Sequence, residues 1–152
     1  MARASSSSAF TTPSDPPLIG ALLRMPWEEV QRRMLARLHE RGFGDLDAAH
    51  LHVFQYPGPQ GARPSELAAR LRISKQALNY LLGQLERLGY LERVADSDDL
   101  RSKRVALTAR GTAAIGVIRE AVADLETAWA RELGTDRFAQ LRGLLLELNG
   151  LA

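Results

Sequence analysis

Residues 63–94 read RPSELAARLRISKQALNYLLGQLERLGYLERV and carry the densest run of structural signals in the chain. Their apolar spacing predicts two helices, one over 64–71 that opens on a proline and one over 74–88. Ser74 is placed to cap the second helix, because its side-chain oxygen can accept a free amide of the first turn, and Gly89 follows its end. Two helices so close together predict a helix-turn-helix.

A β-hairpin is predicted directly after the second helix. The polar run 96–103 lies between two short apolar segments, a pattern typical of two strands joined by a charged loop. The apolar residues on its two sides are Tyr90, Leu91, Val94, Val105 and Leu107. We therefore expect a mainly α fold with a small β-hairpin wing, a winged helix-turn-helix.

Helices are also predicted before the winged unit. Residues 18–39 carry apolar side chains at helical spacing. Pro26 lies among them, so the segment is either a short helix followed by a longer one or a single kinked helix. Asp45 is expected to cap a further helix that reaches Phe54.

Two more helices are predicted after the wing. Thr108 is placed to cap a long helix over 109–133, and Gly134 separates it from a final amphipathic helix. The expected apolar positions are Ile115, Ile118, Val122, Leu125, Trp129 and Leu133 in the long helix, Phe138, Leu141, Leu145 and Leu148 in the final one, and Leu78, Leu81, Leu85 and Leu88 in the helix over 74–88. The long helix would extend about 37 Å, beyond the winged unit, so its exposed stripe needs a partner.

The composition is typical of an ordinary soluble protein, with one local basic excess of the kind that an anionic partner needs. Of the 152 residues 25% are charged and the net charge is +2, but residues 61–104 hold 9 basic against 6 acidic residues. The absence of cysteine excludes disulfides and cysteine-based zinc sites. Residues 1–17 are rich in Ser, Thr, Ala and Pro and are predicted to form a flexible tail. No apolar run reaches the roughly 18 residues of a membrane span, so we expect a cytoplasmic protein with no membrane partner.

Three motifs between residues 65 and 111 together point to one family. They are SELAARLRISKQAL at 65–78, LERLGYLER at 85–93, and Asp99-Leu100-Arg101 followed by VALTARG at 105–111. On these motifs the chain resembles the MarR family of bacterial transcriptional regulators, and looser helical agreement covers most of residues 20–150. The wing motif is the specific part, because many regulators share the helix-turn-helix alone.

The resemblance implies a homodimer that binds DNA. It divides the chain into a tail at 1–17, N-terminal helices for dimerisation and scaffold at 18–60, a DNA-binding lobe at 61–108 and C-terminal dimerisation helices at 109–152. The winged helix-turn-helix is thus framed by N- and C-terminal dimerisation helices.

The helix over 74–88 is predicted to enter the major groove. That groove admits one helix, whose exposed polar side chains meet the bases while its other face stays buried. Gln76 and Asn79 can each pair with adenine. Lys75 suits guanine or phosphate, and Ser74 and Tyr80 suit phosphate. The alternative is a polar helix face that is only solvated.

The wing carries basic and acidic side chains. Arg101, Lys103 and Arg104 are predicted to approach the phosphate backbone or the minor groove, whose negative potential attracts arginine. We favour Arg101 at the wing tip, with a local salt bridge as its alternative role, and expect one of the three to serve structure only. The resemblance implies that Asp99 orients the neighbouring arginine and stiffens the loop.

No metal or cofactor is predicted. His50 and His52 lie near Asp47, but positions 50 and 52 point about 200° apart on a helix and cannot bind one ion. The resemblance implies a small aromatic effector in a cleft between the dimer helices and the winged lobe. Trp27, His50 and Phe54 are the candidates to line it, although an aromatic residue at helical spacing more often belongs to a core.

The expected function is sequence-specific binding of double-stranded DNA. The protein would be a dimeric repressor on a palindromic operator, and a small-molecule ligand could release it from the DNA. The sequence lacks a phosphate-cradling glycine loop, a nucleophile elbow and a His-Glu-x-x-His motif, so it does not favour an enzyme. The alternative function is a winged-helix module for protein–protein contact, in which Tyr80 and the wing meet another chain.

Overall fold

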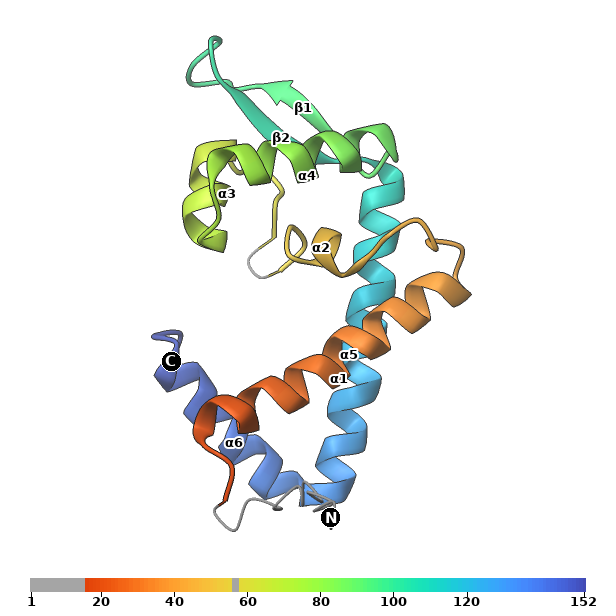
Figure 1. The fold of residues 1–152 in the computed structure, drawn as a ribbon, viewed down its shortest axis with the longest axis vertical. Helices are drawn as coiled ribbons and strands as arrows, with labels where there is room; N and C mark the ends of the chain where they lie inside the picture. The colour runs from red at the N-terminus through yellow and green to blue at the C-terminus, as the bar shows by residue number, and fades with distance from the viewer. Residues whose placement is uncertain (1–15, 56–57) are drawn as a thin grey trace, which may run out of the picture.

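The computed structural model describes residues 16–55 and 58–152, so nearly all of the predicted tail lies outside the described residues. Figure 1 shows a winged lobe at one end and a frame of three longer helices at the other. In chain order the elements are α1 (Ile19–Glu40), α2 (Ala48–Leu51), α3 (Pro64–Leu71), α4 (Lys75–Arg87), β1 (Leu91–Ala95), β2 (Lys103–Leu107), α5 (Ala109–Leu133) and α6 (Thr135–Leu148). The expected mainly α fold with one hairpin is confirmed.

The winged lobe follows the local signals of the sequence. α3 begins at Pro64, and the Ser74 hydroxyl oxygen accepts the amide of Ala77 at 3.0 Å at the start of α4. Gly89 has a φ of 80°, the left-handed conformation that lets the chain leave α4 and enter β1. β1 and β2 pair antiparallel, in a register that places Leu91 opposite Leu107.

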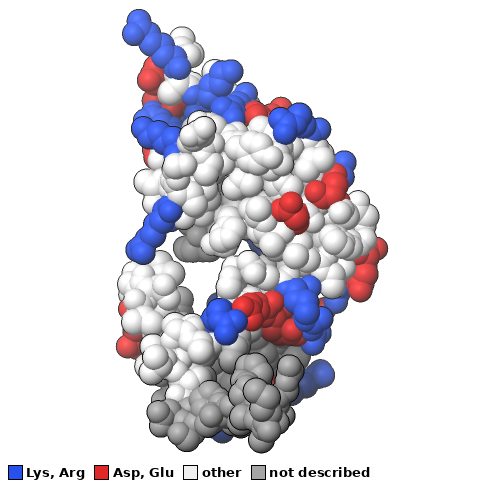
Figure 2. All heavy atoms as spheres, viewed as in Figure 1, with Lys and Arg blue, Asp and Glu red and all other residues white. Residues whose placement is uncertain are grey.

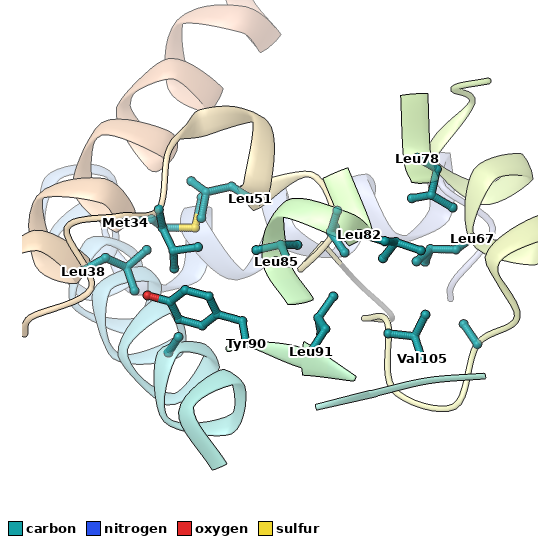
Figure 3. Close-up of a cluster of buried hydrophobic side chains, with 14 of the residues drawn as sticks. Met34, Leu38, Leu51, Leu67, Leu78, Leu82, Leu85, Tyr90, Leu91 and Val105 are labelled. Carbon is teal, nitrogen blue, oxygen red and sulfur yellow. The ribbon is translucent and has the colours of Figure 1, made fainter. Parts of the chain in front are cut away.

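The hydrophobic core joins α1 and α2 to the winged lobe (Figure 3). The labelled side chains come from all of these parts: Met34, Leu38, Leu51, Leu67, Leu78, Leu82, Leu85, Tyr90, Leu91 and Val105. On α4 the expected inner face is partly wrong, because Leu82 is buried while Leu81 and Leu88 are only half-buried. Leu78, Leu82 and Leu85 span only about 60° of the helix circumference, so this narrower face is the one that meets the core.

The segment before the winged lobe differs from expectation at α2. α1 is one helix with Pro26 inside it, but α2 is a single turn that ends at Leu51. Its cap is Asp47, whose Oδ1 accepts the amides of Ala49 at 2.9 Å and His50 at 3.1 Å. The expected cap, Asp45, is instead bonded to the Tyr90 hydroxyl, which removes its carboxylate from the helix start.

α5 buries a face of small residues. Thr108 caps it as predicted, with its Oγ1 accepting the amide of Gly111 at 3.0 Å. The buried positions are Gly111, Ala114, Val117, Ala121 and Leu125, whereas Ile118 and Val122 of the expected stripe are half-buried and Leu133 is exposed. The small side chain of Ala121 lies beside α1 where the two helices cross in Figure 1, whereas Gly111 lies against the Tyr90 backbone of the winged lobe.

α6 contributes nothing to the core of the single chain. It packs against the end of α5, yet none of its residues is buried. Its exposed leucines, together with those at the start of α1, form the apolar surface of the helical frame: Leu18, Ile19, Leu22, Leu23, Leu141, Leu144, Leu145, Leu146 and Leu148. No helix among the described residues has the length and apolarity that a bilayer crossing requires.

Candidate nucleic-acid interface

α4 presents a polar face away from the core. Because Leu78, Leu82 and Leu85 hold its other side, the side chains opposite them face solvent, and Tyr80 is 66% exposed. All five residues that the sequence predicted for DNA contact on this helix are exposed: Ser74, Lys75, Gln76, Asn79 and Tyr80. Gln76 and Tyr80 lie at the centre of the exposed face, about 40° apart, while Lys75 and Asn79 lie on its flank.

Arg87 also lies on this face and was missed by the sequence analysis. It is exposed at the last turn of α4, about 20° from Tyr80 around the helix axis. Its Nη1 lies 3.6 Å from the position that a Cβ on Gly83 would occupy, so the guanidinium folds back along the helix over the glycine. The spacing of Gly83 and Arg87, one helical turn apart, could have indicated in the sequence that the arginine lies over the glycine on this face.

The wing is attached to the rest of the lobe through Asp96. This carboxylate is fully buried and receives Nε of Arg63 at 2.7 Å and Nε of Arg104 at 2.8 Å. The amide of Asp98 and the hydroxyl of Ser102 also donate to it, at 3.0 and 3.2 Å. The hydrogen bond from Arg104, more than any other contact, holds the pKa of Asp96 well below its usual range. The start of α3 and both wing strands are thereby joined at one ionised group.

Arg104 is the basic residue of the wing that serves structure. Besides Asp96, its guanidinium contacts the carbonyl oxygen of Gly61 at 2.8 Å and the Asp98 carboxylate at 3.3 Å. Arg101 and Lys103 are exposed, and neither forms an ion pair within the described residues. Figure 2 shows basic side chains gathered at this end of the molecule, with acidic ones among them.

Asp99 stabilises the wing loop through the backbone. Its Oδ1 accepts the amide of Arg101 at 3.0 Å, and its carbonyl oxygen accepts the amide and hydroxyl of Ser102 at 2.9 and 3.1 Å. These bonds close the turn at the wing tip. Asp99 makes no bond to the Arg101 guanidinium. The charged contacts of the wing are made by Asp96, which the sequence analysis did not single out.

A second charged cluster joins the winged lobe to α5. The buried Tyr90 hydroxyl donates to Asp45, and Nη2 of Arg110 lies 2.8 Å from the same carboxylate. The Arg110 guanidinium also lies 4.6 Å from the centre of the Tyr90 ring, a cation–π contact. Burial, and then the bond to Asp45, raises the pKa of the Tyr90 hydroxyl.

The candidate effector residues are only partly brought together. Trp27 and Phe54 line one apolar pocket of about 240 Å³ between α1, α2 and α5, with Ile118 at its side. His50 does not line it, because its ring turns toward α4, where Nε2 lies 3.2 Å from Oε1 of Gln84. A second pocket of about 260 Å³ shares Phe54 and Ile118 with the first and includes Arg119. Within residues 16–55 and 58–152 no group of three side chains is arranged to hold a metal ion.

Comparison with known proteins assigns this geometry to a family. Residues 45–102 match the model of the MarR family, and E. coli MarR in its reduced form superposes with a TM-score of 0.70. Over residues 45–102 the chain is therefore similar to MarR-family regulators, and its fold is that of the family. The identity to E. coli MarR is 25%, over 88% of this chain and 98% of that one. A search of curated protein sequences finds no match.

Two further solved structures share the MarR-family fold. The transcriptional regulator Tm0710 from Thermotoga maritima is 26% identical, with a TM-score of 0.58 over 88% of this chain and 92% of that one. A mutant of S. aureus MepR bound to an oligodeoxyribonucleotide is 21% identical, with a TM-score of 0.55 over 90% of this chain and all of that one. At that identity the MepR likeness supports the fold alone.

The MarR-family wing motif has a local physical explanation in this chain. Thr108 donates from its hydroxyl to the carbonyl oxygen of Gly89 at 2.6 Å, and so fixes the start of α5 against the end of α4. Gly111 lies under the backbone of Tyr90, and a Cβ at 111 would collide with the Tyr90 carbonyl oxygen. The Leu-Thr-x-x-Gly sequence is therefore needed to pack α5 against the wing.

Proposed function

We propose that this protein is a dimeric repressor that binds a roughly palindromic operator in double-stranded DNA. The observation that carries the proposal is the exposed polar face of α4, held outward by Leu78, Leu82 and Leu85, next to a wing whose Arg101 and Lys103 are exposed. A nucleic-acid reader needs this pairing of a rigid helix with a basic edge. The oligodeoxyribonucleotide bound to MepR, which has the same fold, supports it.

In this arrangement each α4 lies in the major groove. Gln76 and Asn79 read base edges, while Lys75, Tyr80 and Arg87 meet phosphates or guanine. Ser74, whose side-chain oxygen caps α4, can still donate its hydroxyl hydrogen to phosphate. The wing places Arg101 over the adjacent minor groove, and Arg104 supports the wing from within.

The second copy of the chain covers the apolar surface of α1 and α6. A run of exposed leucines of this size is unusual in a monomer and marks a protein contact. A twofold axis through this surface sets the two α4 helices about one DNA turn apart, roughly 34 Å, and gives the operator its inverted symmetry. Residues 61–108 then form the DNA-binding lobe, and the helices before and after it the dimer.

An effector releases the protein only if it prefers the conformation in which the two α4 helices are misplaced. The pocket lined by Trp27 and Phe54 lies between α1, α2 and α5 and is apolar, so a small aromatic molecule suits it. A change in the relative position of α1 and α5 would change its shape.

The test is selection of bound duplexes from a random pool, followed by measurement of affinity at several salt concentrations. We expect an enriched inverted repeat and a steep fall of affinity with salt, because each phosphate contact releases counterions. An unenriched pool and a weak salt dependence would refute the proposal in favour of the protein–protein module.

Two substitutions separate base reading from backbone binding on the enriched duplex. Gln76→Ala should cost about 1–3 kcal/mol and relax specificity at one base pair, because the paired hydrogen bonds to a base edge are lost. Arg101→Ala should weaken specific and mixed-sequence duplexes by the same factor. Equal losses on both duplexes for Gln76→Ala would contradict its assignment.

A further inference from the structure

A chain of hydrogen bonds runs from the buried His50 on α2 to the exposed Tyr80 on α4. The amide of Asp47 donates to His50 Nδ1 at 3.1 Å, and His50 Nε2 lies 3.2 Å from Gln84 Oε1. The Gln84 amide nitrogen then donates to the Tyr80 hydroxyl oxygen at 3.3 Å. His50 is 4% exposed, so one end of the chain is inside the protein and the other at the α4 face.

The direction of every bond in this chain follows from its first donor. A backbone amide can only donate, so Nδ1 of a neutral His50 must accept and Nε2 must carry the hydrogen. Nε2 donates to Gln84 Oε1, which turns the amide nitrogen of Gln84 toward Tyr80. The Asp47 amide therefore fixes the direction of the bond from Nε2 to Gln84.

These bond directions determine where the hydroxyl hydrogen of Tyr80 points. The Tyr80 oxygen accepts from Gln84, so the hydroxyl hydrogen of Tyr80 is repelled from that side and turns to solvent. Among the described residues no side chain or carbonyl accepts this hydrogen. A free donor at the centre of the α4 face matches a phosphate oxygen of DNA, which only accepts.

We propose that His50 and Gln84 are positioning residues that make Tyr80 an obligatory hydrogen-bond donor to a DNA phosphate. The proposal depends on the proposed function, since it concerns how the same α4 face holds DNA. It adds two residues that do not touch DNA, and it gives the buried histidine a role other than the effector pocket.

The test is a set of affinity measurements on the enriched duplex and on a mixed-sequence duplex. Tyr80→Phe should weaken binding to both about tenfold, the value of a hydrogen bond to a charged group. Gln84→Glu keeps the size of the side chain but offers only acceptors, so the Tyr80 hydrogen turns inward and the contact is lost. In the Tyr80→Phe background Gln84→Glu should weaken binding only about threefold, through charge repulsion alone.

Two further measurements distinguish positioning from a general structural effect. Replacing single phosphates of the duplex by uncharged methylphosphonate should identify one position that weakens the wild-type protein and leaves Tyr80→Phe unchanged. Gln84→Met, which adds no charge, should weaken binding about threefold with Tyr80 present and not at all in Tyr80→Phe. Thermal unfolding of each variant checks that it is folded at the assay temperature.

The possible outcomes are distinct. A wild-type protein that binds neither duplex refutes the proposed function and this inference with it. Wild-type binding with an unchanged Tyr80→Phe overturns the phosphate contact alone. A Gln84→Glu effect of the same size with and without the Tyr80 hydroxyl overturns the positioning role of Gln84 and His50.

Discussion

At the scale of single residues, two backbone positions have strict requirements. Gly111 lies against the Tyr90 carbonyl, where any side chain collides. Arg72, between α3 and α4, has a φ of 55°, a left-handed conformation that glycine adopts more easily than arginine. Position 111 therefore holds the glycine that it requires, whereas position 72 holds an arginine where glycine would fit better.

Gly111→Ala should lower the free energy of unfolding by about 2–4 kcal/mol, because the new Cβ must displace the Tyr90 backbone. Denaturation by urea measures this. The matched control is Gly116→Ala in the same helix, where a Cβ meets nothing within 4 Å and helix propensity should add up to about 1 kcal/mol. Equal effects of the two substitutions would contradict the packing role of Gly111.

Arg72→Gly should raise the free energy of unfolding by about 0.5–1 kcal/mol, because relief of the left-handed strain, about 1–2 kcal/mol, outweighs the extra entropy of glycine in the unfolded chain, about 0.4–1 kcal/mol. The same urea experiment measures it. Ala69→Gly, inside α3, should lower stability by a similar amount, since glycine is a poor helix former. A loss of stability on Arg72→Gly would show that the arginine side chain makes a stabilising contact that outweighs the strain.

At the scale of elements, the wing depends on a contact that is distant in sequence. Arg63 at the start of α3 is 33 residues from Asp96, and the two meet only because the wing folds back over α3. Arg104 completes the pair from the opposite strand. The wing is thus held in position by one buried carboxylate and two guanidinium groups.

Asp96→Asn should lower the melting temperature by several degrees and weaken binding to all DNA sequences alike, because the wing loses its charged attachment. The pKa of Asp96 is lowered in the folded protein, so its stabilisation is fully present above the ordinary value of 3.8 and declines as the pH falls below that value toward the lowered one. The difference in melting temperature between wild type and variant should therefore be constant near pH 7 and narrow steadily between pH 4 and pH 2. A difference that does not narrow in this range would contradict the role of the charge.

Two groups provide controls for this measurement. Asp98→Asn, at an exposed carboxylate of the same loop, should change the melting temperature little. On α1, hydrogen bonds from Arg32 and Arg33 lower the pKa of Glu29 to about 2, so part of the acid sensitivity should remain in Asp96→Asn.

At the scale of the whole molecule, the chain is a compact winged lobe on an open helical frame. The lobe shares one core with α1, α2 and the start of α5, and it also joins α5 through Tyr90, Asp45 and Arg110. The frame leaves α6 with no buried residue. One copy of the chain therefore buries the apolar side chains of the winged lobe but leaves those of α6 exposed.

The dimer surface can be tested without disturbing the core. Leu144→Glu together with Leu148→Glu should convert the dimer to a monomer, because both leucines are exposed in one chain and would be buried by a second. Sedimentation equilibrium measures the mass, and affinity for the inverted repeat should fall at least about tenfold with loss of the second half-site. Gln140→Glu on α6 is the control for charge. A wild-type protein that sediments as a monomer would refute the dimer.

The sequence by itself determined the order and the ends of most elements. Helix starts at Ser74 and Thr108, the break at Gly89 and the two wing strands were predicted because they depend on periodicity and on hydrogen bonds between residues a few positions apart. The exposed residues of α4 followed for the same reason, since a leucine-rich face defines the opposite one.

Only the tertiary structure decided which partners those elements meet. In the folded chain Leu82 is buried on the inner face of α4, and Ala121 of α5 lies beside α1. The His50 ring contacts Gln84 rather than the pocket. The tertiary structure also places Asp96 between Arg63 and Arg104. These contacts join segments that no local pattern relates, because side-chain packing and charge pairing depend on distances in the folded chain, which the spacing of residues along the sequence does not record.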